Sequence, residues 1–587
     1  MADFLLGNDL IALAAVHAGA HSAYSYPGTP ASEILGAFRR FAPDRFAQWS
    51  VNEKVALELS TAEAISGRSV LCAMKQVGLN VAADPLFSVA YTGVAGALVL
   101  VSADDPGPHS SQTEQDSRLY ALSARIPVFD PANPRDAWAL TLRAFALSAR
   151  EKIPVLLRPV MRVCHSRQDF DVPAAAAPAP VPAAFVRDPE RWAATPRFRS
   201  VLHERLLAKL SAIAADAWRD DGFAPKHDLA VVASGYPYAV LRDVLAAHPL
   251  PVDLVKVDMP FPLSGEFAAR HLAGYRRLLV AEETFPVIED QLRDRGKVSG
   301  KHDGAMPARG ELTFDILSER LHAFAGKPAP KAARAELPAP PPPAKPRLCA
   351  GCGHRPAFYA IRKSAPDGIF PGDIGCYTLG VNLGAVDSCI CMGASITFAE
   401  AMKRANPDRP VIATIGDSTF FHTGLPGLLN ARLSGAPVVL CILDNGTTAM
   451  TGFQPVPHMA GAGITIEAAV RGLGIDFVRA ADPYDVQGAV ALLKEALAHA
   501  EEASHPAVVI FRRGCVARER PAPRTAPVRV TGACRNCRIC YERFECPALS
   551  EDPALGRAVV DRRLCIDCGV CVDICPFGAI AAGEDAP

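Results

Sequence analysis

The chain has 587 residues, which at about 150 residues per domain suggests roughly four domains. Hydrophobic residues make up 50% and charged residues 21%, the balance of an ordinary globular protein rather than a disordered one. The net charge of -1 leaves no overall basic field, so neither nucleic acid nor a membrane surface is expected as a partner. The 51 prolines and 17 cysteines are the unusual features of the composition, and both are unevenly distributed.

The N-terminal segment lacks the basic start and the small-residue cleavage pattern of a signal peptide, and it carries Asp3 and Asp9. The longest apolar runs, 94–101 and 438–443, are far shorter than the ~20 residues that cross a bilayer. We therefore expect a cytoplasmic protein. In a reducing cytosol, clustered cysteines are more often metal ligands or redox groups than disulfides.

Three tracts rich in proline and alanine, at 172–184, 327–346 and 516–528, divide the chain. Such sequences behave as extended spacers and form no packed core. We therefore predict four domains, over residues 1–171, 185–326, 347–515 and 529–587.

Short apolar runs alternate with helical patterns in the first three of these domains, and the second of them is the smaller. The runs predict strands, in chain order, at 22–26, 46–51, 69–74, 97–102, 154–157, 229–233, 252–257, 278–281, 411–415, 438–443 and 507–511. Strands that alternate with helices indicate doubly wound parallel sheets covered on both faces, an α/β fold class. Ligands of such sheets bind beyond the carboxyl ends of the strands.

The last predicted domain carries eight cysteines in two runs. Residues 565–576 read CIDCGVCVDICP, the C-x2-C-x2-C-x3-C-P spacing of bacterial ferredoxins, and residues 534–547 read CRNCRICYERFECP, with five residues before the final Cys-Pro. In this pattern three cysteines bind one [4Fe-4S] cluster and the fourth binds the other. The spacing predicts one cluster on Cys534, Cys537, Cys540 and Cys575, and a second on Cys546, Cys565, Cys568 and Cys571. A pair of zinc knuckles is the alternative, but zinc sites use cysteine pairs separated by longer loops.

A second candidate site lies in the third predicted domain. One strand leads into Gly416-Asp417-Ser418, and the next ends at Asp444-Asn445, with 26 residues between Ser418 and Asn445. A carboxylate, an amide and a backbone carbonyl at neighbouring strand ends can hold Mg2+, which then bridges a diphosphate. The glycine permits close approach of the backbone to the phosphates. An ordinary turn at the end of a strand is the alternative for the GDS sequence alone.

The order of these two segments resembles the thiamine diphosphate motif, although Ser418 replaces a glycine and Asp444 an asparagine. The resemblance implies that Asp417, Asn445 and the carbonyl of Thr447 ligate Mg2+, and that the following TTAMTG stretch forms part of the cofactor pocket. A thiamine enzyme also needs a glutamate that hydrogen-bonds the aminopyrimidine ring. Glu53 fits this role, although a glutamate at the start of a helix can also serve as a capping partner.

Motifs over nearly the whole chain resemble the 2-oxoacid:ferredoxin oxidoreductases, and among them the large (alpha) subunits of the enzymes that act on indolepyruvate. In the family's order, the motifs are YPGTPASEI (26–34), NEKVALE (52–58), MKQVGLNVAADPL (74–86), ADDPGPHSSQTEQDSR (103–118), CAGCGHRPAFYAI (349–361), GDIGCYTLG (372–380), GDSTFFHTGLPGLLNA (416–431) and LDNGTTAMTGFQ (443–454). Gly353 departs from the pattern, since a second proline is usual there. The resemblance implies two thiamine diphosphate-binding domains, a transketolase C-terminal-like domain and a 2[4Fe-4S] ferredoxin-like domain.

The implied reaction is the oxidative decarboxylation of an aryl pyruvate with coenzyme A, which gives an arylacetyl-CoA, CO2 and reduced ferredoxin. The resemblance also implies that Thr29 and Arg118 hold the substrate carboxylate. An arginine fork suits a carboxylate, although a surface arginine is commoner. The residues implied to bind the cofactor are Gly416, Asp417, Ser418, Asn445, Thr447 and His354.

A third cluster is a further question, because related enzymes bind one beside the thiamine with a C-x2-C pair and a later cysteine. Cys349, Cys352 and Cys376 match that pattern, and Cys515 is a possible fourth ligand that the spacing does not establish. We therefore favour a loop that merely contacts the cofactor.

Related enzymes also contain a separate domain of about 200 residues that has no counterpart here, so the resemblance implies a beta subunit as partner. Three alternatives stay open: an enzyme of this class for another 2-oxo acid, a non-oxidative thiamine decarboxylase, and an electron-transfer subunit with a vestigial thiamine fold. The cysteine-rich tail is unnecessary for the second alternative. The presence of Glu53, Asp417 and Asn445 disfavours the third.

Overall fold

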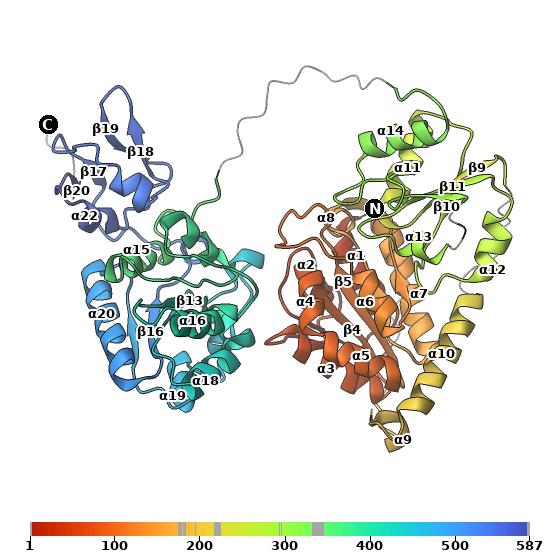
Figure 1. Ribbon diagram of the computed structural model, residues 1–587, viewed down its shortest axis with the longest axis horizontal. Helices are drawn as coiled ribbons and strands as arrows, with labels where there is room; N and C mark the ends of the chain where they lie inside the picture. Colours follow the sequence, from red (N-terminus) through yellow and green to blue (C-terminus); the bar gives the residue numbers. More distant parts are fainter. Residues whose placement is uncertain are drawn as a thin grey trace. The chain divides into compact units, whose positions relative to one another are not determined.

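A computed structural model describes residues 3–173, 179, 183–193, 195–216, 225–292, 294, 296–330 and 345–583. The chain forms two units, Met1–Leu337 and Pro338–Pro587, and the division between them falls in the proline tract at 327–346 (Figure 1). Much of this tract and of the tract at 172–184 lies outside the described residues. The four domain boundaries drawn from the tracts stay predictions.

The first unit contains a six-stranded sheet with the strand order β3-β2-β4-β5-β7-β6. All of its ladders are parallel, as the alternation of strands and helices predicted. Five of the strands lie at predicted positions, whereas β6 has only two residues and was too short to predict. The strands are β2 (Ser22–Ser25), β3 (Phe46–Trp49), β4 (Ser69–Lys75), β5 (Ala97–Ala103), β6 (Val128–Phe129) and β7 (Val155–Leu157).

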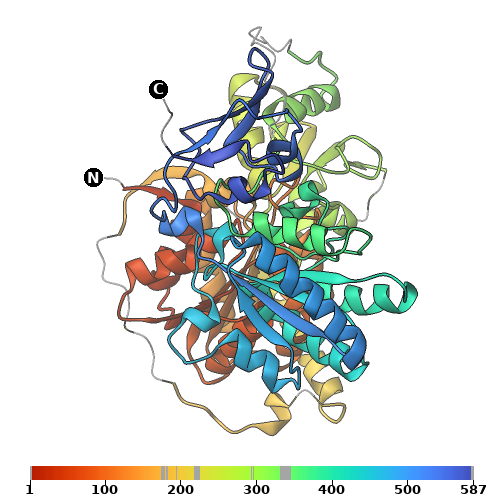
Figure 2. The same ribbon diagram turned by 90° about the vertical axis from the view of Figure 1, so that its left-hand side faces the viewer.

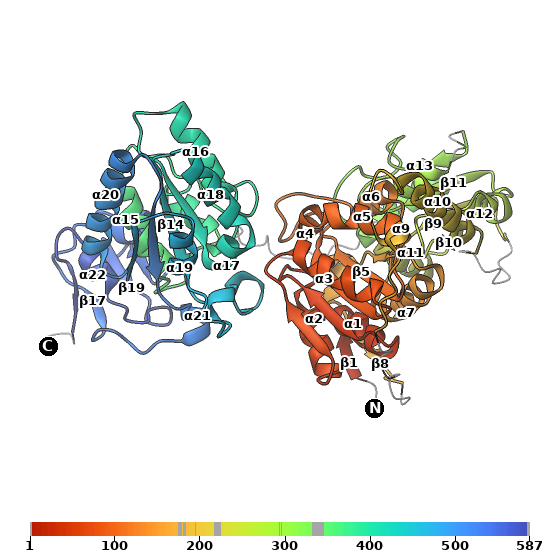
Figure 3. The same cartoon turned by 90° about the horizontal axis from the view of Figure 1, so that it is seen from below.

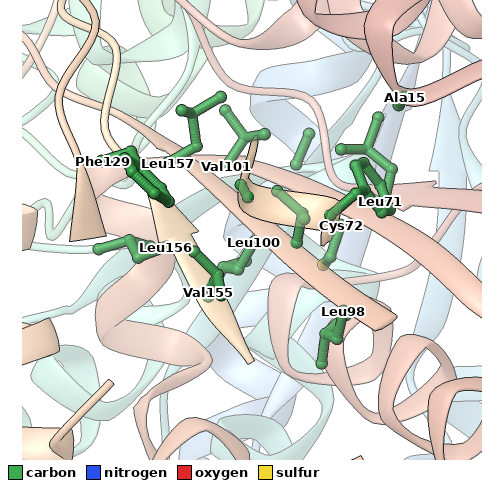
Figure 4. Close-up of a cluster of buried hydrophobic side chains, with 14 of the residues drawn as sticks. Ala15, Leu71, Cys72, Leu98, Leu100, Val101, Phe129, Val155, Leu156 and Leu157 are labelled. Atoms are coloured by element: carbon green, nitrogen blue, oxygen red, sulfur yellow. The ribbon is translucent and has the colours of Figure 1, made fainter. Parts of the chain in front are cut away.

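Helices pack around this sheet in two groups. The first is α1 (Gly7–His17), α2 (Ser32–Phe41) and α7 (Pro134–Glu151), and the second is α3 (Glu53–Ile65), α4 (Gln76–Val81), α5 (Ala83–Thr92) and α6 (Ser117–Ala124). All seven residues of β5 are buried, so the sheet is covered on both faces. Figure 4 shows the apolar contact between β5 and β7, with Leu100 and Val101 beside Leu156 and Leu157.

The remaining elements of this region are four short ones and the 18-residue helix α10. They are β1 (Asp3–Leu6), α8 (Met161–His165), β8 (Arg167–Phe170), α9 (Pro189–Trp192) and α10 (Arg199–Asp216). Strands β1 and β8 pair antiparallel, which brings the start of the chain against the segment that follows β7.

A smaller parallel sheet follows in the same unit, with the order β10-β9-β11-β12. Its strands are β9 (Leu229–Ala233), β10 (Asp253–Lys256), β11 (Arg277–Ala281) and the unpredicted β12 (Val298–Ser299). Helices α11 (Gly235–Ala247) and α14 (Phe314–Phe324) cover one face, and α12 (Gly265–Phe267) and α13 (Val287–Gln291) cover the other. This second α/β sheet is the smaller one that the sequence predicted.

The second unit is built on a parallel sheet with the order β13-β14-β16-β15. Its strands are β13 (Ile412–Gly416), β14 (Val439–Asp444), β15 (Val478–Ala481) and β16 (Ala507–Arg512), of which only β15 was not predicted. Helices α15 (His354–Ser364) and α20 (Val486–Ala503) pack on one face, and α16 (Ala394–Ala405), α18 (Leu425–Leu433) and α19 (Ile466–Gly472) pack on the other (Figure 3). This is the doubly wound arrangement that was expected.

The C-terminal tail folds into small antiparallel pairs. Strand β17 (Val528–Val530) pairs with β20 (Ile580–Ala582), and β18 (Leu549–Asp552) pairs with β19 (Arg557–Val560), with α22 (Val570–Ile574) before β20. Phe544 and Ile574 of the tail form a buried cluster with Tyr484 and Val486, so the tail packs on the sheet domain of its own unit (Figure 2). The proline tract at 516–528 is not wholly extended, since it contains the short helix α21 (Val516–Glu519).

No helix among the described residues has both the length and the apolar character needed to span a bilayer.

Candidate functional site

Two aspartates lie at the carboxyl ends of neighbouring strands in the second unit. Asp417 follows β13 and opens the short helix α17 (Asp417–Thr419), and Asp444 is the last residue of β14. Both side chains are buried. The carboxylate of Asp417 accepts backbone hydrogen bonds from Ser418 at 2.8 Å and from Gly446 at 2.9 Å. The two loops that the sequence predicted to bind a metal therefore meet at Asp417.

The pKa values of the two carboxyl groups shift in opposite directions. Burial, and then the negative charge of Asp444, raises the pKa of Asp417 to about 7. Burial would also raise the pKa of Asp444, but hydrogen bonds from His458 and Arg512 lower it to about 2. The protein around Asp417 therefore provides too little positive charge to keep its carboxyl group fully ionised.

His458 joins the two aspartates. Its Nε2 lies 3.0 Å from Oδ1 of Asp444 and 4.0 Å from Oδ2 of Asp417, and one potential ligand atom from each of the three residues lies within 4.8 Å of the others. Neither Asp444 nor His458 was predicted as a ligand from the sequence. Asp444 was visible as a departure from the usual motif, but His458 lies 14 residues later in the short 3-10 helix Pro457–Met459, with no regular spacing to point to it.

The other predicted cofactor residues gather around Asp417. Oδ1 of Asn445 accepts a hydrogen bond from the backbone of Thr447 at 3.1 Å, and its Nδ2 lies 3.4 Å from Nε2 of His354. His354 opens α15, and burial lowers its pKa to about 4, so its ring is neutral and can accept that hydrogen bond. The hydroxyl of Thr448 donates to the hydroxyl of Ser418 at 3.2 Å, which joins the loops after β13 and β14.

Gly416 has a steric role in this site. A Cβ at this position would lie 2.3 Å from a ring carbon of Tyr377, so no larger residue fits under that ring. The hydroxyl of Tyr377 donates to the carbonyl of Ile374 at 2.6 Å and is hydrogen-bonded to the hydroxyl of Thr419 at the same distance. The aromatic ring thereby holds the segment at 374–377 against the turn after β13.

Glu53 is the first residue of α3 in the first unit and is buried. The side chain of Asn52 caps this helix by accepting a hydrogen bond from the backbone of Val55 at 2.9 Å. Glu53 is therefore not needed as the capping residue. Its carboxylate packs against Gly78 of α4, where a Cβ would lie 2.4 Å from Oε1.

The two residues predicted to hold a substrate carboxylate lie in different environments. Thr29 is half-buried in the turn between β2 and α2, before a cis Thr29-Pro30 bond. Arg118, at the start of α6, is fully buried, which excludes the surface position that was considered for it. Its guanidinium donates to Asp116 at 2.7 and 2.9 Å, to Glu282 at 2.9 Å and to the carbonyl of Phe285 at 2.9 Å. These contacts tie the start of α6 to the segment at 282–285.

The eight cysteines of the tail form two groups. Cys534, Cys537, Cys540 and Cys575 line one cavity, and Cys546, Cys565, Cys568 and Cys571 line another. Burial and then the other thiolates of its group raise the pKa of Cys540 to about 12, and the same causes raise the pKa of Cys571 even further. Each group places four cysteine sulfurs around one space, where burial and mutual repulsion disfavour the thiolate forms. The structure thus brings together the same two sets of four that the spacing predicted.

A third group lies at the loop before α15. Burial raises the pKa of Cys352 to about 12, and the thiolates of Cys349 and Cys376 act in the same direction. The pKa of Cys376 rises to about 11 through burial and through the thiolates of Cys515 and Cys349. Cys515, which the spacing left unplaced, therefore lies close to Cys376.

Two side chains connect this third group to the tail. Arg355 is buried, and it donates hydrogen bonds to the carbonyls of Leu348 and Cys349 and also to those of Phe544 and Glu545. Tyr484 packs with Phe544 of the tail and donates to the carbonyl of Gly351, and the guanidinium of Arg513 lies 3.6 Å from the centre of its ring.

The cavity lined by Cys546, Cys565, Cys568 and Cys571 is also lined by Gly351, Cys352 and Tyr484. The third cysteine group and this tail group are therefore direct neighbours.

Comparison with known families agrees with these two kinds of site. Residues 373–511 match the model described as "Thiamine pyrophosphate enzyme, C-terminal TPP binding domain", and residues 558–581 match "4Fe-4S binding domain". Thiamine pyrophosphate is another name for thiamine diphosphate. The fold and the sites therefore define a thiamine diphosphate enzyme subunit that carries iron–sulfur clusters, an oxidoreductase of the 2-oxoacid:ferredoxin type.

Curated relatives narrow this class. The "Indolepyruvate oxidoreductase subunit IorA" of Archaeoglobus fulgidus is 38% identical, with 98% of this chain and 97% of that protein covered. The proteins of the same name from Methanothermobacter marburgensis and Thermococcus kodakarensis are 38% and 36% identical, and each alignment covers 98% of this chain and at least 96% of the relative. The chain belongs to the family of indolepyruvate oxidoreductase IorA subunits.

Proposed function

We propose that the chain is the large subunit of a cytoplasmic enzyme that oxidatively decarboxylates aryl pyruvates, indolepyruvate among them. The reaction takes one 2-oxo acid anion, one coenzyme A and two oxidised ferredoxins, and it gives one arylacetyl-CoA, CO2, one proton and two reduced ferredoxins. One observation carries this proposal: groups of four cysteines lie in the same unit as the thiamine diphosphate domain. The group that includes Cys568 adjoins Cys352. An oxidation that releases two electrons and the one-electron carriers that accept them are thus combined in one unit.

The residues around Asp417 fit a magnesium diphosphate. Mg2+ prefers oxygen ligands, and Asp417, Asp444, Asn445 and the carbonyl of Thr447 would supply them. The raised pKa of Asp417 indicates a buried carboxyl group that a cation would stabilise in its charged form. When bound, thiamine diphosphate supplies the electron sink for decarboxylation.

The chain's own residues would position and activate that cofactor. The segment from Gly416 to Ser418 would lie along the diphosphate, and neutral His354 would hold the amide of Asn445 in place. Glu53 would hydrogen-bond the aminopyrimidine ring. This assignment is supported by its burial at the start of α3.

Of the two residues predicted to bind the substrate carboxylate, Thr29 fits this role better than Arg118. A substrate carboxylate would reach the guanidinium of Arg118 only by displacing Asp116 or Glu282, both of which are also buried. The structure favours Arg118 as an internal tie of the first unit.

The three cysteine groups support an electron path within the second unit. Cys349, Cys352, Cys376 and Cys515 would hold a cluster beside the thiamine domain, and the group that includes Cys568 adjoins them. The group that includes Cys534 would pass electrons to ferredoxin. The third cluster, which the spacing alone disfavoured, is supported by the position of Cys515.

The relatives are named as subunits, so we propose a beta subunit as the partner in catalysis. An enzyme of this class for another 2-oxo acid is the main alternative for the substrate. Non-oxidative decarboxylation is a weaker alternative, because it would leave the three cysteine groups without a function.

The test is an anaerobic assay of the chain with its partner subunit over a panel of aryl and aliphatic 2-oxo acids. We expect ferredoxin or viologen reduction that depends on coenzyme A and is fastest with aryl pyruvates. Activity with pyruvate and none with aryl pyruvates would exclude the proposed substrate class. Release of CO2 without reduction of the acceptor would exclude the oxidative reaction itself.

A further inference from the structure

Two imidazoles and a carboxylate meet at the edge of the second unit's sheet that lies opposite Asp417. Asp476 comes two residues before β15, His499 lies near the end of α20, and His505 comes two residues before β16. Because β15 and β16 are parallel to β13 and β14, their first residues lie at the edge away from the carboxyl ends. A strand of five or six residues spans about 17–20 Å, so this cluster is well separated from the proposed diphosphate site.

The three side chains converge on one oxygen. Nε2 of His499 lies 3.1 Å from Oδ1 of Asp476, and Nε2 of His505 lies 3.4 Å from the same oxygen. One potential ligand atom from each residue lies within 4.8 Å of the other two. The two imidazole rings are 5.6 Å apart and nearly perpendicular, and the ring of Phe477 packs 5.0 Å from that of His499. The cluster is thus held by packing as well as by its polar contacts.

The tautomer of His505 makes this arrangement unusual. Its Nδ1 lies 3.0 Å from the carbonyl oxygen of Pro506, and a carbonyl can only accept, so Nδ1 carries a proton. In the neutral ring, Nε2 then presents a lone pair toward the carboxylate oxygen of Asp476. Two acceptors at this distance repel each other unless a cation lies between them. That cation is either a second proton on His505 or a metal ion.

The same geometry is typical of metal-binding histidines. The ring nitrogen that does not bind the metal commonly donates to a backbone carbonyl, which fixes the tautomer and aims the other nitrogen at the ion. The side chain of His505 is 10% exposed and that of Asp476 is 68% exposed, so one ligand is fixed in the interior while the site stays open to solvent.

We propose that Asp476, His499 and His505 form a zinc site, with two imidazole nitrogens, one carboxylate oxygen and a water molecule as the fourth ligand. Imidazole and carboxylate are ordinary zinc ligands, and four ligands complete its tetrahedral shell. The ion would join the end of α20 to the starts of β15 and β16. This site is independent of the proposed reaction and of the thiamine diphosphate site.

The test is zinc binding by the iron-loaded chain under anaerobic conditions, measured by metal analysis after desalting and by competition with a chromophoric chelator. We expect the wild type to bind one more zinc ion per chain than His499→Ala or Asp476→Asn. Added zinc should raise the melting temperature of the wild type and leave that of both variants unchanged.

His302→Ala is the matched control. It removes an imidazole that lies 2.7 Å from Asp290. Among the described residues, this pair belongs to no group of three potential metal ligands. Zinc binding by this variant should equal that of the wild type. Iron content is measured in every sample, and unchanged iron shows that the cysteine groups are intact.

Equal zinc binding by the wild type, His499→Ala and Asp476→Asn would overturn the proposal. That result is also expected if the cation facing Asp476 is a second proton on His505. Asp476→Asn is nearly isosteric, so it decides the question even if His499→Ala does not fold.

Discussion

The side chain of Glu53 lies directly against the backbone of Gly78, where a Cβ would come within 2.4 Å of Oε1 and 2.6 Å of Cγ. Glu53 opens α3 and Gly78 lies in α4, so the contact between these two helices fixes the carboxylate. Gly78 therefore leaves the room that the side chain of Glu53 needs.

The substitution Gly78→Ala tests the proposed role of Glu53 without removing the carboxylate. The added methyl group must displace Glu53, and a misplacement of about 1 Å can lower the rate about 100-fold. We expect kcat/KM to fall by that order while circular dichroism shows a folded chain. Gly36→Ala is the control, since nothing lies within 4 Å of a Cβ there, in α2. Wild-type kcat/KM in Gly78→Ala would contradict the assignment.

The substitution Arg118→Met separates a structural role from a substrate-binding role. It leaves Asp116 and Glu282 buried without their partner, and breaking a buried pair in this way costs about 3–5 kcal/mol. We expect a loss of that size in the free energy of unfolding, measured with urea. Arg162→Met is the control, because the side chain of Arg162 is 47% exposed, and an ion pair of an exposed arginine is worth about 0–1 kcal/mol. Unchanged stability with a raised KM would instead support substrate binding by Arg118.

The raised pKa of Asp417 predicts how stability depends on pH. Its pKa of about 7 in the folded chain lies above the ~3.9 of a free aspartate, so the folded state binds this proton more tightly than the unfolded state. The stabilisation that this proton gives to the folded, metal-free chain is fully present below about pH 4 and is lost as the pH rises to about 7.

The corresponding measurement is the free energy of unfolding of the metal-free chain at several pH values. Asp417→Asn cannot ionise, so its profile should lack this decline, whereas Asp408→Asn, at an exposed position, should follow the wild type. Identical profiles for the wild type and Asp417→Asn would show that Asp417 titrates normally.

Iron content tests the third cluster. We expect twelve iron atoms per anaerobically prepared chain, and eight after Cys376→Ser, because one [4Fe-4S] cluster would lose a ligand. Cys391→Ser is the control, since Cys391 is an exposed cysteine outside the three groups. Eight iron atoms in the wild type would show that the loop at 349–352 only contacts the cofactor.

The sequence predicted the elements that depend on local patterns. Buried strands such as β5 and β14 appear as continuous apolar runs, and the ferredoxin spacing divided the tail cysteines into the sets that line the two cavities. Two-residue strands such as β6 and β12 carry too few side chains to form a recognisable pattern.

Contacts between distant segments could not be predicted in this way. The burial of Arg118 depends on Glu282, which lies 164 residues later in the chain. The position of Cys515 beside Cys376 depends on where β16 ends, and that of His458 on the turn after β14. Such placements follow from the packing of the sheet, and no spacing between residues encodes them.

The contacts of Arg355 show what replacing the cysteine-rich tail with another ferredoxin domain would require. This arginine belongs to α15, is 1% exposed, and donates to the carbonyls of Phe544 and Glu545. Removing the tail, or grafting an unrelated ferredoxin in its place, would leave a buried guanidinium without these acceptors. The proposed electron carrier is thus part of the interior of the domain it would serve, so engineering that swaps electron carriers has to redesign this boundary as well.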